Sequence, residues 1–279
     1  MTTVTLVHPG SMGAAIAAQM VAAGHEVLWA PEGRSENTWH RAREAGAQAC
    51  DSLAEALSSS AVALSVCPPP AAEDVATAVS ACDFTGVYVD ANAISPQRML
   101  RIEEKVRPGS AVVDGAVFGP PPAGGLTARL YLAGATRSVE LVVTLFTNSD
   151  LHVRRVGDTV GSASALKMAF AGYQKAARTL AGVSHALAHA HGVGDELMEE
   201  AETMVSAILS DPEYLPSVAA KAWRWAPEMN EVADTLRAVN LPADMAEATA
   251  RVLSHWEQNK DQYGLPVSEV LSRLRSRAG

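Results

Sequence analysis

The sequence predicts an α/β protein, with a doubly wound parallel sheet in its first part and an all-helical second part. Short apolar runs alternate with helix-like stretches as far as Gly157, which is typical of a parallel sheet covered by helices. A glycine-rich turn joins the first apolar run directly to the first helix. Strand signals are nearly absent beyond Gly157, so we expect one domain over residues 1–160 and a second over residues 161–279.

The elements of the first domain follow from this alternation. The apolar runs predict strands at residues 4–7, 26–29, 61–66, 86–90, 110–115 and 130–133. The stretches between them predict helices at residues 12–23, 36–45, 52–58, 71–80 and 96–106. In such sheets ligands bind at the carboxyl ends of the strands, so the proline-rich and glycine-rich loops that begin at Cys67 and Phe118 are expected to face a ligand.

The second domain is predicted to begin with one long helix over residues 162–190. This stretch lacks proline, and its apolar side chains step by three and four residues, as at Leu166, Phe170, Tyr173, Ala177 and Leu180. That spacing is typical of a helix with 3.6 residues per turn. Further helices are expected at residues 195–209, 217–231, 232–239, 243–258 and 268–278.

The turn at residues 8–13 predicts a dinucleotide site. Gly10 lets the backbone approach a pyrophosphate, Gly13 lets the helix pack against the strand, and the first N–H groups, at Ser11 and Met12, face the anion. His8 stands where the first glycine of the pattern G-x-G-x-x-G belongs. The position of the turn, after a strand and before a helix, is the context that the motif requires. A strand–turn–helix without a ligand is the alternative.

The residues after the second strand indicate which nicotinamide coenzyme is bound. No acidic residue stands at the tip of this strand to bind a ribose hydroxyl, whereas Arg34 and Ser35 follow closely. A guanidinium and a hydroxyl suit a 2′-phosphate, which predicts NADP (NADPH) rather than NAD. In the alternative interpretation, Arg34 is a solvated loop residue and Glu32 binds the ribose.

The composition excludes several classes of protein. Hydrophobic residues make up 48% and charged residues 19%, so a folded, soluble protein is expected, and a net charge of −9 leaves no basic stripe for nucleic acid. No apolar run reaches the roughly 20 residues of a membrane span, and no signal peptide is evident. Three cysteines without C-x-x-C spacing indicate a reducing, cytoplasmic setting. His185 and His189 share a helix face, but no acid completes a site, so no metal is expected.

These motifs resemble those of the 3-hydroxyacid dehydrogenase and 6-phosphogluconate dehydrogenase superfamily, which includes imine reductases. Residues 8–13 look like its Gly-x-Gly-x-Met-Gly turn, residues 33–35 like its Asn-Arg-Thr element, and residues 221–229 like its phosphogluconate-dehydrogenase-like branch. Residues 65–69 are similar to the strand end that covers the cofactor, which implies that Cys67 and Pro68 contact it. Asn92 stands in the family's Asp-x-Ser-Thr-x-x-Pro segment and is predicted either to bind the nicotinamide ribose or substrate, or to form a turn.

The resemblance covers the whole chain and also implies the substrate site. Residues 114–119 stand where the family has its substrate loop, Asp-Ala-Pro-Val-Ser-Gly, which implies that Phe118 and Gly119 contact the substrate. Residues 161–167 look like Gly-x-Gly-x-x-x-Lys, which supplies the catalytic lysine, here Lys167. The family architecture is an N-terminal Rossmann domain, a long interdomain helix and a helical C-terminal domain that usually pairs in a homodimer.

Several departures from the family pattern bear on the substrate. The family's asparagines after the lysine are replaced by Phe170 and Ala171, the loop serine by Phe118, and a late Lys-Asp pair by Glu228 and Met229. The substrate is therefore expected to be less polar than a simple hydroxyacid. Glu228, with Glu231 one turn further, is predicted either to bind a cationic or amine group or to form a solvated acidic face.

These observations together predict an NADP-dependent oxidoreductase that acts on a small carbonyl or hydroxyl compound. Lys167 is the expected general acid and base, with a pKa lowered by partial burial and by the helix dipole; a structural lysine that reaches to solvent is the alternative. An NADPH-dependent imine reductase is the second interpretation, and a non-catalytic NADPH-sensing protein is the third. A homodimer is expected because a second copy would cover the apolar helical domain.

Overall fold

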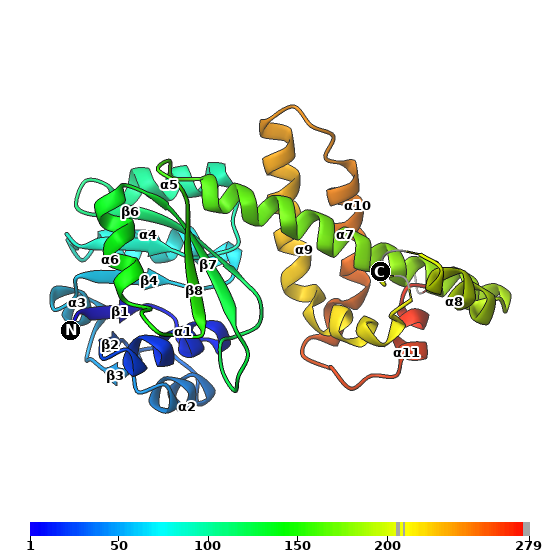
Figure 1. Ribbon diagram of the computed structural model, residues 1–279, viewed down its shortest axis with the longest axis horizontal. Helices are drawn as coiled ribbons and strands as arrows, with labels where there is room; N and C mark the ends of the chain where they lie inside the picture. Colours follow the sequence, from blue (N-terminus) through cyan, green and yellow to red (C-terminus); the bar gives the residue numbers. More distant parts are fainter. Residues whose placement is uncertain (205–206, 209, 276–279) are drawn as a thin grey trace. The chain divides into compact units, whose positions relative to one another are not determined.

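The computed structural model describes residues 1–204, 207–208 and 210–275 and divides into two compact units, Met1–Lys167 and Met168–Gly279 (Figure 1). The first unit extends beyond the boundary at residue 160 that the sequence suggested. The reason is that residues 161–164 are hydrogen bonded to the sheet, so the start of the long helix belongs to the first unit.

The first unit contains one eight-stranded sheet in the order β3-β2-β1-β4-β5-β6-β7-β8. The strands are β1 Thr3–Leu6, β2 Glu26–Trp29, β3 Gln48–Ala49, β4 Val62–Ser65, β5 Val87–Asp90, β6 Ala111–Phe118, β7 Ala128–Gly134 and β8 Leu151–Gly157. All neighbours pair in parallel except β6 and β7, which are antiparallel. The predicted α/β fold is therefore confirmed, with one antiparallel pair in a mostly parallel sheet.

Each of the six α-helices of the first unit lies between two strands in the chain. They are α1 Ser11–Ala22, α2 Glu36–Glu44, α3 Leu53–Ser58, α4 Ala72–Ser80, α5 Pro96–Val106 and α6 Thr136–Thr144. Buried side chains of α1 and α6, such as Ile16 and Val142, pack with Val89 of β5. Side chains of α4 and α5, such as Val75, pack with Tyr88, the adjacent residue of β5. Because adjacent strand residues point to opposite faces, the helices cover both faces of the sheet.

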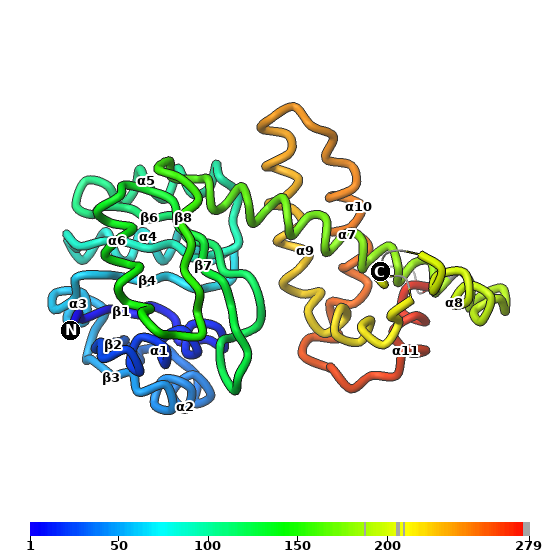
Figure 2. Tube along the Cα trace, in the orientation of Figure 1, coloured from blue at the N-terminus to red at the C-terminus, as the bar shows by residue number. Residues whose placement is uncertain are grey.

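The second unit contains only helices within the described residues, and its chain path can be followed in Figure 2. The helix α7 Ser162–His191 begins in the first unit, and α8 Gly194–Glu202, α9 Leu215–Ala238, α10 Asp244–Leu253 and α11 Val267–Arg273 follow it, with a short 3-10 helix at Ser254–Asn259 after α10. In the described part of the chain, no helix combines the length and apolar character that a membrane crossing requires.

Several of the sequence-based elements need correction. The two helices predicted at 217–231 and 232–239 form the single helix α9, because Met229, Val232 and Ala233 continue one buried face. The helix predicted at 243–258 is an α-helix only as far as Leu253. The strands β3 and β8 and the helix α6 were not predicted. The helix predicted at 195–209 is observed as α8, which ends at Glu202, and the helix predicted at 268–278 is observed as α11, which ends at Arg273. Residues 209 and 276–278 lie outside the described residues.

Candidate dinucleotide and catalytic site

The turn between β1 and α1 has the geometry of a pyrophosphate cradle. The Gly10 N–H donates to the His8 carbonyl at 2.9 Å, and a Cβ at Gly13 would lie 2.3 Å from that carbonyl oxygen, so only glycine fits at position 13. A Cβ at Gly10 would meet no atom of the described chain within 4 Å, so the space beside it is open. No side chain of the described residues caps α1, which leaves the N–H groups of its first turn, at Ser11 and Met12, available to an anion.

The two glycines of this turn are expected to respond differently to alanine. Gly13→Ala forces a contact with the His8 carbonyl and is expected to destabilise the fold by about 3 kcal/mol, measured by urea unfolding. Gly10→Ala is the matched control for stability, because its methyl group enters open space. It is expected to unfold like wild type but to weaken coenzyme binding, and unchanged coenzyme affinity would contradict the assignment of the cradle.

Arg34 and Ser35 lie after β2, near the cradle. Arg34 is half-buried, and its Nη2 donates to the carbonyl of Val7 at 3.4 Å, so the guanidinium lies against the end of β1 and is not a freely solvated loop group. The hydroxyl of Ser35 accepts a hydrogen bond from the Thr38 N–H at 3.4 Å and caps α2. Glu32, the alternative ribose ligand, is exposed. The capping role of Ser35 was not anticipated from the sequence.

The ends of β4 and β5 are joined by the side chain of Asn92. Its Oδ1 accepts the N–H of Cys67 at 2.5 Å, and its Nδ2 donates to Ser65 Oγ at 3.0 Å. The Asn92 N–H donates to Asp90 Oδ1 at 3.1 Å, which closes a turn. The turn is thus closed by the Asp90 carboxylate, and the Asn92 amide holds the two strand ends together. Pro68, which follows Cys67, is exposed.

Burial also decides the chemistry of two groups in this region. It raises the pKa of the Cys67 thiol to about 12, so the thiol stays protonated and is a poor nucleophile. It raises the pKa of Asp90 to about 7, although hydrogen bonds from Asn92 oppose this rise. Asp90 pairs in register with Asp114 of β6, so the raised pKa limits repulsion between two neighbouring buried carboxyl groups.

Asp114 caps the helix that carries the predicted catalytic lysine. Its Oδ2 accepts the N–H groups of Gly161, Ala163 and Ser164 at 2.9, 2.8 and 3.0 Å, and its Oδ1 accepts the Ser164 hydroxyl at 2.7 Å. Burial raises the pKa of Asp114, and these hydrogen bonds oppose the rise. This role was not predicted from the sequence, because the cap comes from a strand almost fifty residues before the helix.

Lys167 lies in the second turn of α7 and is partly buried. Its Nζ donates to the carbonyl of Val117 at 2.8 Å and lies 4.9 Å from the ring centroid of Phe118. Phe118 is itself buried and packs edge-on against Tyr131. Gly119 follows with a φ of +110°, and a Cβ there would lie 3.1 Å from the Thr127 carbonyl, so the loop turns at a position that requires glycine.

Lys167 and the cradle belong to the same edge of the sheet. The strands β1, β4, β5 and β6 pair in parallel, so their carboxyl ends lie at one edge. The cradle follows β1, whereas Val117, which binds the Lys167 ammonium, is near the end of β6. This is the edge at which doubly wound sheets bind their ligands.

The remaining predicted site residues lie in the second unit. Glu228 is buried and forms an ion pair with Lys175 at 2.7 Å, and the Lys175 ammonium also lies 5.2 Å from the Trp225 ring. The expected solvated acidic face is therefore wrong, because Glu228 and Glu231 are both buried. Lys175 was missed, although a second lysine in the apolar α7 sequence was a usable signal.

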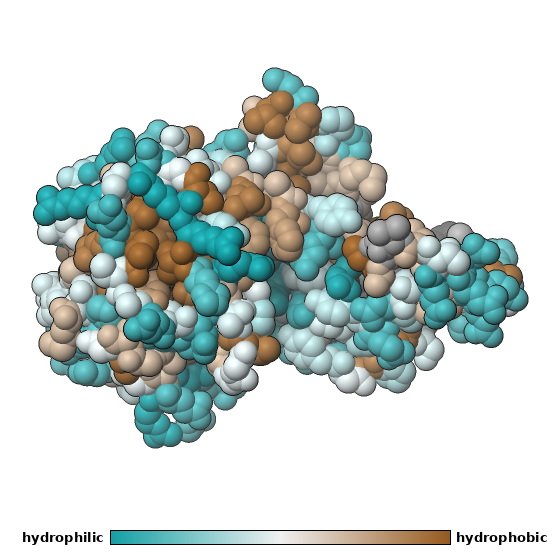
Figure 3. Space-filling view, viewed as in Figure 1, coloured by the Kyte–Doolittle hydropathy of each residue, from teal (hydrophilic) through white to brown (hydrophobic). Residues whose placement is uncertain are grey.

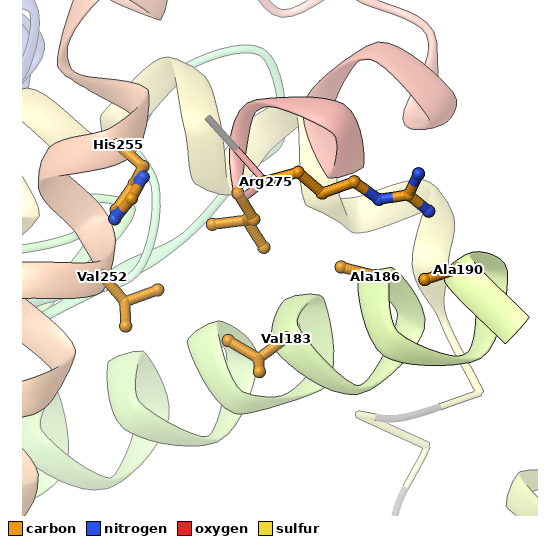
Figure 4. Close-up of a pocket in the computed structure, with 7 residues that line it drawn as sticks. Val183, Ala186, Ala190, Val252, His255 and Arg275 are labelled. Atoms are coloured by element: carbon orange, nitrogen blue, oxygen red, sulfur yellow. The ribbon is translucent and has the colours of Figure 1, made fainter. Parts of the chain in front are cut away.

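The predicted substrate residues on α7 differ in exposure. Phe170 is exposed, whereas Ala171, the next residue, is almost completely buried. Further along α7, an apolar cavity lies between this helix, α10 and α11, lined by Val183, Ala186 and Val252 with His255 and Arg275 at its edge (Figure 4). Across the described ranges of the chain, no three His, Cys, Asp or Glu side chains converge as metal ligands.

Comparisons with known proteins agree with this architecture. Residues 3–93 match the family described as NADP oxidoreductase, coenzyme F420-dependent, and residues 188–256 match a domain of unknown function, DUF1932. One solved structure is that of a conserved protein of unknown function, which was found to resemble 3-hydroxyacid dehydrogenases. Its sequence is 27% identical to this one, the match covers 95% of this chain and 100% of that one, and the TM-score is 0.71. A search of curated proteins gives no significant match.

Two further solved structures share the fold. A 3-hydroxyisobutyrate dehydrogenase from Mycobacterium tuberculosis is 17% identical, and the match covers 99% of this chain and 100% of that one with a TM-score of 0.77. A reductive aminase from Aspergillus terreus is 17% identical, and the match covers 97% of this chain and 98% of that one with a TM-score of 0.58. The fold and the cradle define a protein that binds a nicotinamide dinucleotide. The matches confirm the predicted resemblance to the 3-hydroxyacid dehydrogenase superfamily, and they support an NAD(P)-dependent oxidoreductase.

Proposed function

We propose that the protein is an NADP-dependent oxidoreductase that interconverts a carbonyl and a hydroxyl group on a small molecule, with Lys167 as general acid and base. The observation that carries this proposal is the Lys167 ammonium, held by the Val117 carbonyl at the sheet edge where the dinucleotide cradle lies. The donors of a lysine ammonium can protonate a substrate oxygen, and the bond to the Val117 carbonyl fixes the position of this one.

The residues of the first unit divide the work between binding and proton transfer. Bound NADP supplies or accepts the hydride. The turn that contains Gly10 and Gly13 holds the pyrophosphate through the N–H groups at the start of α1. Lys167 donates a proton to the substrate oxygen during carbonyl reduction and accepts it from the hydroxyl in the reverse direction. The buried ring of Phe118 makes the surroundings of the ammonium apolar, which suits a substrate less polar than a simple hydroxyacid.

Arg34 is proposed to select NADP over NAD by binding the 2′-phosphate, together with the Ser35 hydroxyl. Arg34→Ala is expected to raise the dissociation constant of NADPH about tenfold or more, the scale of a lost charge-assisted hydrogen bond, and to leave that of NADH nearly unchanged. Titration of both coenzymes against both proteins measures this difference. Equal, small effects on the two coenzymes would refute the assignment.

The absorbance of the reduced nicotinamide tests the reaction itself. One arm offers NADP⁺ with hydroxyacids and alcohols, and the other offers NADPH with ketones, aldehydes and cyclic imines. Turnover on the oxygen compounds supports the proposal. Turnover confined to imines would replace it with imine reduction, the activity named for several structural relatives. The ion pair of Glu228 with Lys175 speaks against that alternative, because this carboxylate is already neutralised. Tight NADPH binding without any turnover would favour a sensing protein.

A homodimer is proposed to cover apolar side chains of the second unit. Tyr173 and Leu180 on α7 are 69% and 57% exposed, and Figure 3 shows further hydrophobic side chains at the α9–α10 connection, where Leu241 and Met245 are exposed. The change Leu180→Asp is expected to convert a dimer to a monomer in light scattering after size exclusion. Val143→Asp, at an exposed apolar position of the first unit, is the control that leaves the mass unchanged. A wild-type monomer would refute this proposal.

A further inference from the structure

His8 occupies the position of the first motif glycine, and its backbone shows why a side chain is tolerated there. The backbone of His8 lies outside the left-handed region that would require glycine. Its carbonyl is fixed from two directions, by the Gly10 N–H at 2.9 Å and by the close approach of Gly13. The imidazole therefore extends from a fixed backbone position in the turn that forms the cradle.

The side chains of His8 and Arg34 carry complementary polar atoms without partners. Arg34 donates from Nη2 to the carbonyl of Val7, the residue before His8, so the two side chains are neighbours at the end of β1. Among the residues that the structure describes, neither His8 Nδ1 nor Arg34 Nε has a hydrogen-bond partner, and both atoms are buried. The Nε of arginine can only donate, whereas Nδ1 of a neutral imidazole accepts when the proton is on Nε2.

The charge state of His8 suits the accepting role. Burial, and then the positive charge of Arg34, lower the pKa of His8 to about 4. Arg34 is the charged group that acts on the imidazole in this structure, and it follows β2, the strand that pairs with β1. The imidazole is therefore neutral at physiological pH, and it does not add a second cation beside the guanidinium.

We propose that His8 is a positioning residue that accepts a hydrogen bond from Arg34 Nε and so directs the guanidinium toward the 2′-phosphate of NADP. This inference rests on the proposed coenzyme assignment of Arg34 and deepens it. A hydrogen bond between the two side chains satisfies both orphaned atoms at once and leaves the outer edge of the guanidinium for the phosphate. In a chain with glycine at position 8, Arg34 would lack this support.

Three variants of the full-length protein test the role. His8→Asn places an amide oxygen close to the position of Nδ1, whereas His8→Gly restores the motif glycine and His8→Leu fills the space without an acceptor. The dissociation constants of NADPH and NADH are measured for each variant by calorimetric titration. The ratio of the two constants is the readout, because a change in the pyrophosphate turn alters both coenzymes equally. Circular dichroism confirms that each variant is folded.

His8→Gly and His8→Leu are expected to lower the preference for NADPH over NADH about tenfold, by weakening NADPH binding alone, whereas His8→Asn keeps it within about threefold. His8→Gly on the Arg34→Ala background is expected to cause no further loss. A preference that His8→Gly leaves unchanged, or equal losses for both coenzymes, would overturn the inference. If Arg34→Ala abolishes the preference and His8→Gly does not, the inference alone fails; if wild type shows no preference, the coenzyme assignment fails with it.

Discussion

Replacing Lys167 by alanine is expected to reduce turnover by about 100-fold or more, the lower range for loss of a general acid. The ammonium is removed from the Val117 carbonyl and from the Phe118 ring, but no contact of the dinucleotide cradle changes. The affinity for NADPH should therefore stay within about twofold of wild type, because the coenzyme is proposed to bind through the backbone groups of the turn at Gly10. Steady-state turnover and coenzyme titration measure the two effects separately.

Lys167→Arg is the matched control for this experiment. An arginine keeps a positive charge near the Val117 carbonyl, but it does not release a proton in the accessible pH range. We therefore expect the arginine variant to be almost as inactive as the alanine variant. Near-normal turnover in Lys167→Ala would remove the lysine from the reaction. Activity in Lys167→Arg but not in Lys167→Ala would assign Lys167 a purely electrostatic role.

The sequence predicted the fold well where local signals were strong. The apolar runs of β1, β2, β4, β5, β6 and β7 and the helix α7 were all expected, because each is a continuous pattern over several residues. β3 consists of two exposed residues, and β8 contains three basic residues, His152, Arg154 and Arg155, so neither resembles a buried parallel strand. Both are strands because of the neighbours that they pair with.

The candidate site, like the fold, was predictable where its residues lie close together in the sequence. Gly10 and Gly13 were recognised because the motif is short and contiguous. The cap from Asp114 to α7 and the ion pair of Lys175 with Glu228 were not predicted, since each joins elements about fifty residues apart. For such pairs the residue types are visible in the sequence, but the partner is decided only by how the strands and helices pack.

Contacts between residues far apart in the sequence also explain the departures from the family pattern. Asn92 replaces a residue that was expected near the substrate, yet its amide is bonded to Cys67 and to Ser65 and holds two strand ends together. Glu228 replaces a lysine, and a lysine on α7 neutralises it. Each of these two residues is thus held by a polar contact that no single motif reveals. The proposed substrate preference accordingly rests on Lys167 and Phe118, whose contacts are within the first unit.

Asp114→Ala is expected to have the largest effect on stability. It leaves the N–H groups of Gly161, Ala163 and Ser164 without their acceptor at the buried start of α7, and each unsatisfied donor is costly. We expect the free energy of unfolding to fall by on the order of 4 kcal/mol, at the upper end for single substitutions. Urea unfolding measures this loss. Turnover should fall as well, because Lys167 lies only one turn beyond the capped residues.

Ser164→Ala measures the contribution of the single hydroxyl contact apart from that of the three N–H contacts of the cap. It removes only the 2.7 Å bond to Asp114 Oδ1 and leaves the three N–H groups on Oδ2, so a loss of about 1 kcal/mol is expected. Asp114→Asn is expected to fall between the two variants, since one amide oxygen can still accept. If Asp114→Ala were no less stable than Ser164→Ala, the carboxylate would not anchor α7, and the position of Lys167 would need another explanation. The order of the three variants therefore tests how the strand β6 holds the helix that carries the lysine.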